Sequence, residues 1–309
     1  MDPVPPASGP PDRPRCFIAG CGYVGTRLAR RLVPDHSLRG LARNDERAAA
    51  LRGIGVEPVL ADLDAGTSGA GDLPDAVDGA AIFYLVPPSD TSPTDARLAR
   101  FLALLGKASP TAVVYMSTTG VYGDTGGAVV TERAELAPGS DRARRRVAAE
   151  RIVTDWCASR RVRCVVLRVP GIYGPDRLPL ERLRRGEPAL RPQDAGPGNR
   201  IHVDDLVSAC IAALGCSASG AFNVTDGDHA STTDYLLATA ELAGLPPPRL
   251  VTRDEARTQI PPAMLAFLVE TRRVDNTRMR DVLRVPLRYP DMRAGIAASL
   301  AEMQAKTGR

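Results

Sequence analysis

Residues 16–30, CFIAGCGYVGTRLAR, decide the fold expected of this chain. A short apolar run leads into three glycines spaced G-x-G-x-x-G, and a helical pattern with Leu28 and Leu32 on one side follows. In a strand–turn–helix of this kind, the first glycine permits the turn, the second lets backbone approach a pyrophosphate, and the third lets helix pack on strand. The helix N-terminus then offers free N–H groups and a positive dipole to the anion. The stretch predicts a dinucleotide site, and a purely structural turn is the alternative. The residues predicted to bind the dinucleotide are Gly20, Cys21, Gly22, Tyr23, Val24 and Gly25.

Composition limits the class of protein. The chain has 309 residues, 44% of them hydrophobic and 25% charged, with a formal charge of +4, as in an ordinary globular protein that does not target nucleic acid. Three separated histidines and six cysteines without a C-x-x-C spacing predict no metal site and reduced thiols in a cytoplasmic protein. Residues 1–14, rich in proline, are expected to form a disordered leader. No run approaches the ~20 apolar residues of a membrane span.

Apolar runs alternate with helical patterns along the first 225 residues. This alternation predicts an α/β fold, a Rossmann-type doubly wound parallel sheet, in which residues 15–168 form an NAD(P)-binding domain completed by about 200–225. Residues 169–199, rich in proline, glycine and arginine, and residues 226–309, mainly helical, are expected to form a smaller substrate-binding lobe. Strands are expected over 16–19, 36–42, 56–60, 80–86, 112–116, 162–167 and 221–224, and helices over 45–51, 94–107, 140–159 and 203–214.

Arg43 closes the second predicted strand, 18 residues after Gly25. The residue at this place meets the adenosine ribose, where an acid binds a free 2′-hydroxyl and an arginine pairs with a 2′-phosphate. Arg43 therefore favours NADP, with NAD still possible because Arg43 could simply be solvated while Asp45 binds a ribose hydroxyl. Asp62 and Leu63 follow the third strand, where the acid could accept a hydrogen bond from the adenine amino group.

A second group of polar residues follows the strand predicted over 112–116. The sequence STTGVYG, residues 117–123, places several hydroxyls directly after that strand. In an open parallel sheet, ligands bind at the carboxyl ends of the strands. We therefore expect these hydroxyls to lie near the bound ligand.

Six motifs in order resemble the extended short-chain dehydrogenase/reductases, that is the NAD-dependent epimerase/dehydratase family. They are GCGYVG (20–25), ADL (61–63), STTGVYG (117–123), RVPGIYGP (168–175), RIHVDDL (200–206) and AFNVTDG (221–227). The likeness extends from residue 15 to about 289 and implies the Rossmann-type fold and an NAD(P)-dependent reaction. It also implies cofactor contacts by Thr118, Arg146 and Pro170.

Family catalysis uses a serine or threonine together with a tyrosine and a lysine four residues apart on the long helix. By the resemblance, Thr118 supplies the hydroxyl, and the tyrosine and lysine positions fall on Arg142 and Arg146. This is an atypical member, because arginine is not deprotonated at working pH and Arg142 cannot shuttle a proton. Arg146 could still hold ribose hydroxyls.

Four other side chains are candidates to replace the missing tyrosine: Tyr122, Asp124, Tyr173 and His202. Each also has a structural interpretation, since tyrosines pack in cores, aspartates cap turns and a lone histidine is more often a satisfied structural residue. The sequence leaves this choice open, with Thr118, Tyr122, Arg142 and Arg146 as the proposed catalytic set.

Two functions follow. The first is an NAD(P)-dependent oxidoreductase or epimerase for a small carbonyl, alcohol or sugar-type substrate, which the arginines of residues 169–199 would suit if it is anionic. The second is a non-catalytic NADP(H)-binding sensor or scaffold, because both signature residues are replaced. The arginine-rich long helix lacks interleaved aromatic residues, so nucleic-acid binding is not expected. In the family this helix often packs against its copy, so a homodimer is possible, although like charges would then need acidic partners.

Overall fold

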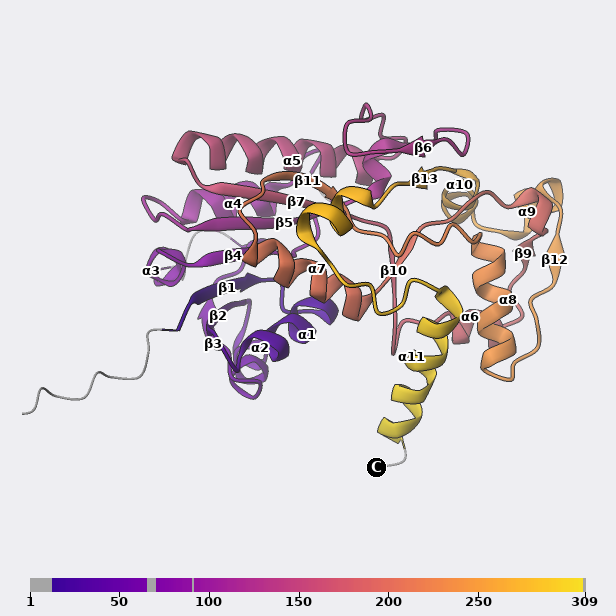
Figure 1. Ribbon diagram of the computed structural model, residues 1–309, viewed down its shortest axis with the longest axis horizontal. Helices are drawn as coiled ribbons and strands as arrows, with labels where there is room; N and C mark the ends of the chain where they lie inside the picture. Colours follow the sequence, from indigo (N-terminus) through magenta and orange to yellow (C-terminus); the bar gives the residue numbers. More distant parts are fainter. Residues whose placement is uncertain (1–12, 66–70, 91, 308–309) are drawn as a thin grey trace, which may run out of the picture.

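A computed structural model describes residues 13–65, 71–90 and 92–307 (Figure 1). All but the last two residues of the leader expected over 1–14 lie outside the described residues. Within these ranges, no helix combines the length and apolar character needed to cross a lipid bilayer.

Seven parallel strands form the central sheet in the order β11-β7-β5-β4-β1-β2-β3. The order reverses between β1 and β4, the switch point at which such sheets bind ligands beyond the carboxyl ends of their strands. This confirms the doubly wound, Rossmann-type sheet. The strands are β1 (Arg15–Ala19), β2 (Ser37–Ala42), β3 (Glu57–Leu60), β4 (Ala81–Tyr84), β5 (Ala112–Thr118), β7 (Arg163–Val169) and β11 (Gly220–Asn223).

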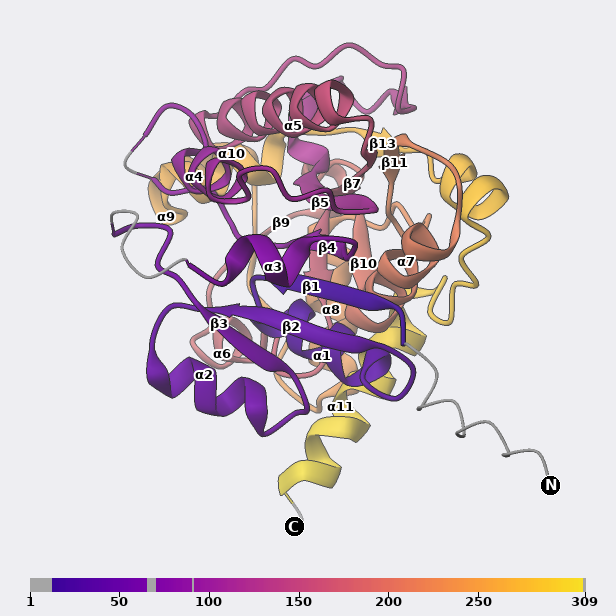
Figure 2. The same ribbon diagram turned by 90° about the vertical axis from the view of Figure 1, so that its left-hand side faces the viewer.

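Helices cover both faces of the sheet (Figure 2). Because strand side chains alternate, Cys16 and Ile18 of β1 pack in the core on the side of α1, α2 and α7, whereas Phe17 and Ala19 pack on the side of α3, α4 and α5. Both core clusters are buried, which explains the continuous apolar character of the strands. The helices are α1 (Tyr23–Leu32), α2 (Asp45–Arg52), α7 (Val203–Gly215), α3 (Leu73–Val77), α4 (Ala96–Leu104) and α5 (Asp141–Arg160).

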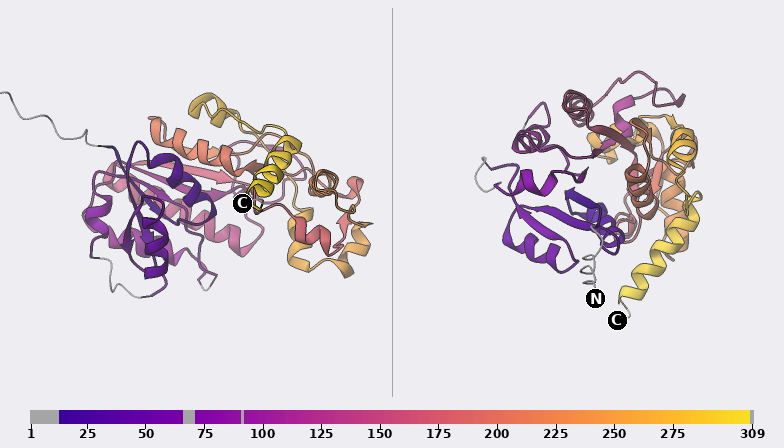
Figure 3. Two further views of the ribbon diagram at one scale, coloured as in Figure 1. Left: turned by 90° about the horizontal axis from the view of Figure 1, so that it is seen from below. Right: turned by 60° about the vertical axis from the view of Figure 1, so that its left-hand side comes forward.

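The remaining elements gather beyond the sheet, at the right of Figure 1 and again in both views of Figure 3. Residues 169–199 are not all loop, because short strands pair within and beyond this segment: β8 with β10, and β9 with β12. A third pair, β6 with β13, closes over the end of β5. These elements are β6 (Val129–Val130), β8 (Gly171–Tyr173), α6 (Leu180–Arg184), β9 (Ala189–Leu190), β10 (Arg200–His202), α8 (Thr232–Leu242), β12 (Leu250–Val251), α9 (Arg253–Gln259), α10 (Pro262–Val269), β13 (Arg273–Val274) and α11 (Met292–Thr307), with short helical turns η1 (Thr119–Tyr122), η2 (Pro192–Asp194) and η3 (Met279–Leu283).

A buried ion pair fastens the carboxyl edge of the sheet to α5. The Arg168 guanidinium, at the end of β7, lies 2.8 Å from a Glu150 carboxylate oxygen, and both side chains are 8% exposed. Ser117, near the end of β5, donates to the same carboxylate. Arg168 also donates to the hydroxyl oxygen of Tyr122 at 2.9 Å, and that hydroxyl donates to Asn223 on β11 at 2.6 Å. Strands β5, β7 and β11 are thereby tied to one helix and to η1.

Removal of one member of this pair is expected to be costly, because it leaves a buried charge without its partner. Glu150→Gln should lower the free energy of unfolding by roughly 3–5 kcal/mol. Urea denaturation followed by circular dichroism measures this loss. Glu57→Gln is the matched control, since Glu57 is 64% exposed in its pair with Arg39 and should cost less than about 1 kcal/mol. Equal losses in the two variants would contradict the assignment.

Candidate functional site

In the turn after β1, two of the three glycine positions have no room for a side chain. Gly20 has a φ of +101°, and an added Cβ would lie 2.9 Å from the carbonyl carbon of Leu85 at the end of β4. A Cβ on Gly25 would collide with the carbonyl oxygen of Gly20. The turn is therefore held close to β4, and α1 is held close to the turn.

Gly22 is different, because an added Cβ would meet nothing within 4 Å. It is the N-cap residue of α1, where no side chain caps the helix and no acidic residue stands in the first turn. The first N–H groups of a helix have no intrahelical partner, and together with the helix dipole they bind phosphate. The open space over Gly22 fits the pyrophosphate of a dinucleotide.

Two neighbours of these glycines have local roles. Val24 is buried, so that only its backbone faces the turn. The Cys21 thiol contacts the carbonyl oxygen of Ile18, and burial raises the pKa of this thiol to about 12. Both residues therefore offer backbone, and not reactive side chains, to a ligand.

Tyr23 connects the turn to the distant residues 175–177. Its hydroxyl donates to the carbonyl oxygen of Pro175 at 2.6 Å, and the Arg177 guanidinium lies 4.2 Å from the centre of its ring. The first residue of α1 thus touches the segment that follows β8.

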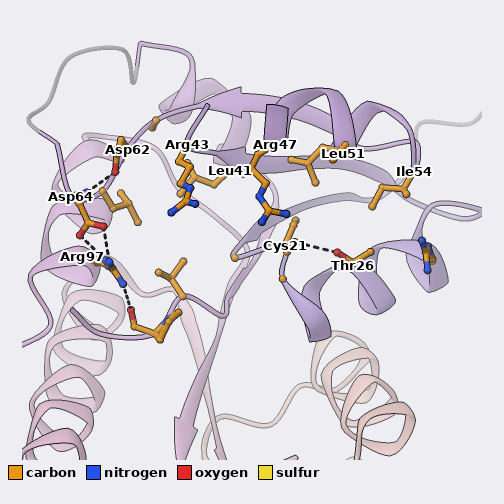
Figure 4. Close-up of a pocket in the computed structure, with 18 residues that line it drawn as sticks. Cys21, Thr26, Leu41, Arg43, Arg47, Leu51, Ile54, Asp62, Asp64 and Arg97 are labelled. Carbon is orange, nitrogen blue, oxygen red and sulfur yellow. Dashed lines mark hydrogen bonds and ion pairs between the residues drawn. The ribbon is translucent and has the colours of Figure 1, made fainter. Parts of the chain in front are cut away.

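A cavity of about 530 Å³ opens beside the turn. In Figure 4, Arg43 from the end of β2 and Arg47 from the first turn of α2 both extend their guanidinium groups into this space. The predicted site residues Gly20, Cys21, Gly22, Arg43, Asp62 and Leu63 all line it.

The opposite wall of this cavity contains an ion pair. Asp64 lies 2.6 Å from the Arg97 guanidinium, which also donates to the carbonyl oxygen of Pro87 (Figure 4). Asp62 accepts a hydrogen bond from the Asp64 amide at 2.8 Å, which leaves its second carboxylate oxygen for a ligand. Sequence analysis missed Arg47 and Arg97. Arg47 could have been found from its place in the first turn of the helix that follows Arg43.

A second cavity, of about 230 Å³, lies between the carboxyl ends of β5 and β7 and the outer elements. Thr119 and Pro170 line it from the sheet, while Tyr173 and Tyr235 line it from β8 and α8. Its charged lining residues are Arg177, Arg200, Glu270 and Arg272. Sequence analysis did not single out Glu270 or Arg272, which no recognised motif contains.

Thr118 lies beside the first turn of α5, the turn that contains Arg142. A Cβ on Gly120 would lie 3.5 Å from the Thr118 hydroxyl oxygen and 3.8 Å from Cβ of Ala143, so the first turn of α5 adjoins the end of β5. The Thr118 oxygen accepts from the Gly120 amide at 3.2 Å, which leaves its proton for another acceptor. Arg142 is exposed and makes no ion pair within the described part of the chain.

Arg146 is buried one turn further along α5. Its guanidinium donates to the Tyr115 hydroxyl and to the Met116 carbonyl oxygen, both at 2.9 Å. The side chain is therefore fixed against β5, at the height at which the sheet's ligand-binding edge begins. Its role toward a ribose stays a prediction.

The other proton-donor candidates have structural partners. The Tyr122 hydroxyl is engaged with Asn223 and Arg168, and burial raises its pKa. Asp124 accepts from the Thr271 amide at 2.9 Å and from Gly126, and these hydrogen bonds lower its pKa. Each environment stabilises the protonation state that the side chain already has at neutral pH, which argues against proton exchange with a substrate.

His202 and Tyr173 are also held in place. His202 caps α7, the role expected for Asp204 or a neighbour, by accepting from the Asp204 amide at 3.2 Å, and burial lowers its pKa to about 4. Its other ring nitrogen faces Ser299. Burial raises the pKa of Tyr173, whose ring packs edge-on against His202.

Thiols and possible metal ligands form no further centre in the described ranges. The six cysteines are free, four buried and two half-buried. No three histidine, cysteine, aspartate or glutamate side chains of these residues come together as metal ligands would.

The glycine turn, the switch-point cavity and the polar edge of β5 together define a nucleotide-binding α/β protein of the short-chain dehydrogenase type. The chain belongs to the NAD-dependent epimerase/dehydratase family, whose profile matches residues 16–225. This confirms the resemblance seen in the motifs.

Individual relatives differ in how much they share with this chain. A 3-diazoavenalumate denitrifying reductase from a Streptomyces species is 32% identical over 138 residues. The match covers 43% of this chain and 45% of the relative, so the chain spans less than half of that relative's length.

Solved structures share the whole fold. A conserved protein of unknown function from Silicibacter pomeroyi has a TM-score of 0.76 at 31% identity, over 96% of this chain and all of the other. MoeE5 in complex with UDP-glucose and NAD has a TM-score of 0.74 at 22% identity, over 96% and 100%. UDP-N-acetylglucosamine 4-epimerase from Methanobrevibacter ruminantium has a TM-score of 0.77 at 12% identity, over 96% and 99%.

Alanine substitution at Gly22 and at Gly25 is expected to affect stability differently. Gly22→Ala adds a methyl group in open space, so the free energy of unfolding should stay within about 0.5 kcal/mol of the parent while dinucleotide affinity falls at least tenfold. Gly25→Ala should lose both stability and binding, because its Cβ collides with backbone. Thermal unfolding and nicotinamide fluorescence titration separate the two effects. Unchanged affinity in a folded Gly22→Ala protein would exclude a pyrophosphate from the turn.

Proposed function

We propose that this protein is an NADP(H)-dependent reductase of a small anionic carbonyl compound. The observation that carries the proposal is the junction of β5 and α5, where the Thr118 hydroxyl lies beside the first turn of α5. Arg142 belongs to this turn, and its exposed guanidinium makes no ion pair within the described residues. These groups can stabilise a carbonyl oxygen that becomes negative, but Arg142 cannot accept a proton. Epimerisation through oxidation of an alcohol needs such an acceptor, so the reductive direction is favoured.

Arg43 and Arg47 support a preference for NADP over NAD. Both guanidinium groups enter the cavity beside the glycine turn, where a 2′-phosphate on the adenosine ribose would lie (Figure 4). Guanidinium groups bind phosphate with two parallel hydrogen bonds, and two of them would neutralise most of its charge. Asp62 is placed to accept from the adenine amino group.

The residues of this chain divide the reaction between them. A nicotinamide cofactor held at the glycine turn would supply the hydride for the carbonyl carbon of the substrate. Thr118 donates its hydroxyl proton in a hydrogen bond to the carbonyl oxygen, and the Arg142 charge stabilises that oxygen as it becomes negative. Water would supply the final proton, because a guanidinium is not deprotonated at working pH. Arg146, fixed to β5, would hold the cofactor's ribose.

The substrate end of the site supports an anion. Three arginines line the 230 Å³ cavity against one carboxylate, Glu270. The reductase from Streptomyces acts, by its name, on a diazo carboxylate, 3-diazoavenalumate, and its partial likeness supports reduction of an organic anion.

A non-catalytic NADP(H)-binding protein is the alternative, favoured by the loss of both the tyrosine and the lysine. The two functions differ in one measurement. A protein that binds NADPH tightly but oxidises it with no member of a carbonyl panel is a binder.

The cofactor preference is tested by titration with NADPH and NADH, followed by nicotinamide fluorescence. We expect NADPH to bind at least tenfold more tightly than NADH, and Arg43→Asp to weaken NADPH while leaving NADH within about twofold. Arg47→Ala should likewise weaken NADPH binding and leave NADH binding within about twofold. Equal affinities in the unmodified protein would exclude a 2′-phosphate site at Arg43.

The catalytic proposal is tested by NADPH consumption with a panel of keto acids and aromatic aldehyde acids. Arg142→Met should reduce kcat/KM by about 10²–10³-fold, the usual loss on removing one oxyanion-stabilising group, with NADPH affinity unchanged. Arg144→Met is the control, because Arg144 is exposed on the same turn and pairs with Asp141. Unchanged kcat/KM in Arg142→Met would remove Arg142 from the mechanism.

A further inference from the structure

The second cavity is small, and two glycines in its wall pack closely on their neighbours. Its volume of about 230 Å³ is below the roughly 300–1,000 Å³ of sites that enclose drug-sized ligands. The loop over residues 196–198 packs closely, because a Cβ on Gly196 would collide with the Thr271 side chain and one on Gly198 would lie 2.6 Å from the Ala230 carbonyl oxygen. Neither glycine can gain a side chain without displacing these neighbours. A compound of one ring fits this space, and a nucleotide sugar does not.

One wall of the cavity is apolar and partly aromatic. The rings of Tyr173 and Tyr235 meet edge to face with centroids 5.8 Å apart, and Ile172 and Leu268 add aliphatic surface. Both tyrosine hydroxyl oxygens are buried away from the cavity. What these residues present to a ligand is therefore ring surface, which favours a flat apolar group.

The other wall is positive. Arg272 lies 2.8 Å from Glu270, so this pair is internally balanced. Arg177 is exposed, stacks on Tyr23 and has no ion pair within the described ranges.

Arg200 adds charge from a buried position, where its guanidinium donates to the carbonyl oxygens of Ala230 and Ser231 at 2.7 and 3.0 Å. Behind it, burial raises the pKa of Asp226 to about 8, so that this carboxyl does not cancel the Arg200 charge at neutral pH. The cavity keeps an excess of positive charge, in which Arg177 is exposed and Arg272 is engaged by Glu270 and by the Gly123 carbonyl oxygen.

We propose that this cavity binds a monocyclic carboxylate, with the ring against Tyr173, Tyr235 and Leu268 and the carboxylate on Arg177 and Arg272. The inference rests on the proposed function and narrows its substrate class. It separates this chain from MoeE5, the structural neighbour that binds UDP-glucose. Glu270 then competes with the ligand for Arg272, so that removal of the Glu270 charge is expected to raise the affinity for the ligand.

The probe is benzoate, titrated calorimetrically into the full-length protein with and without saturating NADPH. We expect benzoate to bind at least tenfold more tightly than benzamide, which lacks the charge, and than acetate, which lacks the ring. UDP-glucose should not displace benzoate.

Two substitutions with opposite expected effects on benzoate affinity locate the site. Arg177→Met should weaken benzoate at least tenfold, and it should leave the fold intact because the side chain is exposed. Glu270→Gln should tighten benzoate several-fold by freeing Arg272. Arg257→Met is the matched control, since Arg257 is 71% exposed on α9 and outside the cavity, and it should change nothing.

Any of three results would overturn the proposal: no benzoate binding, equal binding to the parent and Arg177→Met proteins, or displacement of benzoate by UDP-glucose. Failure of the proposed function is distinguishable from these. Benzoate binding without NADPH binding would exclude the reductase and keep the carboxylate site. NADPH binding without benzoate binding would exclude the carboxylate site and keep the reductase.

Discussion

The buried pair of Arg168 and Glu150 holds together the edge of the sheet at which both cavities open. Strands that end side by side expose their last carbonyl groups and hydroxyls to water, and without a fastening the loops beyond them would be free to separate. Here the guanidinium of β7 is shared between α5 and η1, and η1 is shared with β11. Buried charges of this kind are costly when unpaired, so the network has one arrangement of low energy. That arrangement sets where Thr118 and the start of α5 face each other.

Helix α5 has its N-cap at Ser140 and packs on β5. Arg142 and Arg146 stand in its first two turns, and the sequence predicts that they occupy the positions of the family's tyrosine and lysine. Arg146 is accommodated by neutral partners, a tyrosine hydroxyl and a carbonyl oxygen, which use its planar donors without neutralising it. The ligand-binding edge thus has arginine side chains along α5, which carry positive charge. Positive charge at this place would stabilise electron-rich oxygen atoms.

The sheet and the glycine turn could be predicted because they follow local rules. Apolar runs bounded by turns gave the strands to within a few residues, and glycines at 20 and 25 are required by backbone contacts that only a glycine satisfies. Cavity walls follow no local rule. Glu270 and Arg272 arrive from a segment about 100 residues beyond β7, and the parallel pairs β9–β12 and β6–β13 that position it join two-residue strands without a periodic pattern. The cap of α7 also has no usual sequence signal, since a buried histidine stands where aspartate or serine is common.

Tyr23 gives the two ends of the site a mechanical connection. It directly follows the glycine over which a pyrophosphate fits, its hydroxyl is bonded to Pro175, and the Arg177 guanidinium rests on its ring. One rigid aromatic side chain therefore spans from the dinucleotide turn to the mouth of the smaller cavity. Because one ring makes both contacts, a ligand that moved the turn would also change the surroundings of Arg177. By thermodynamic reciprocity, a ligand at Arg177 would have an equal effect on binding at the turn.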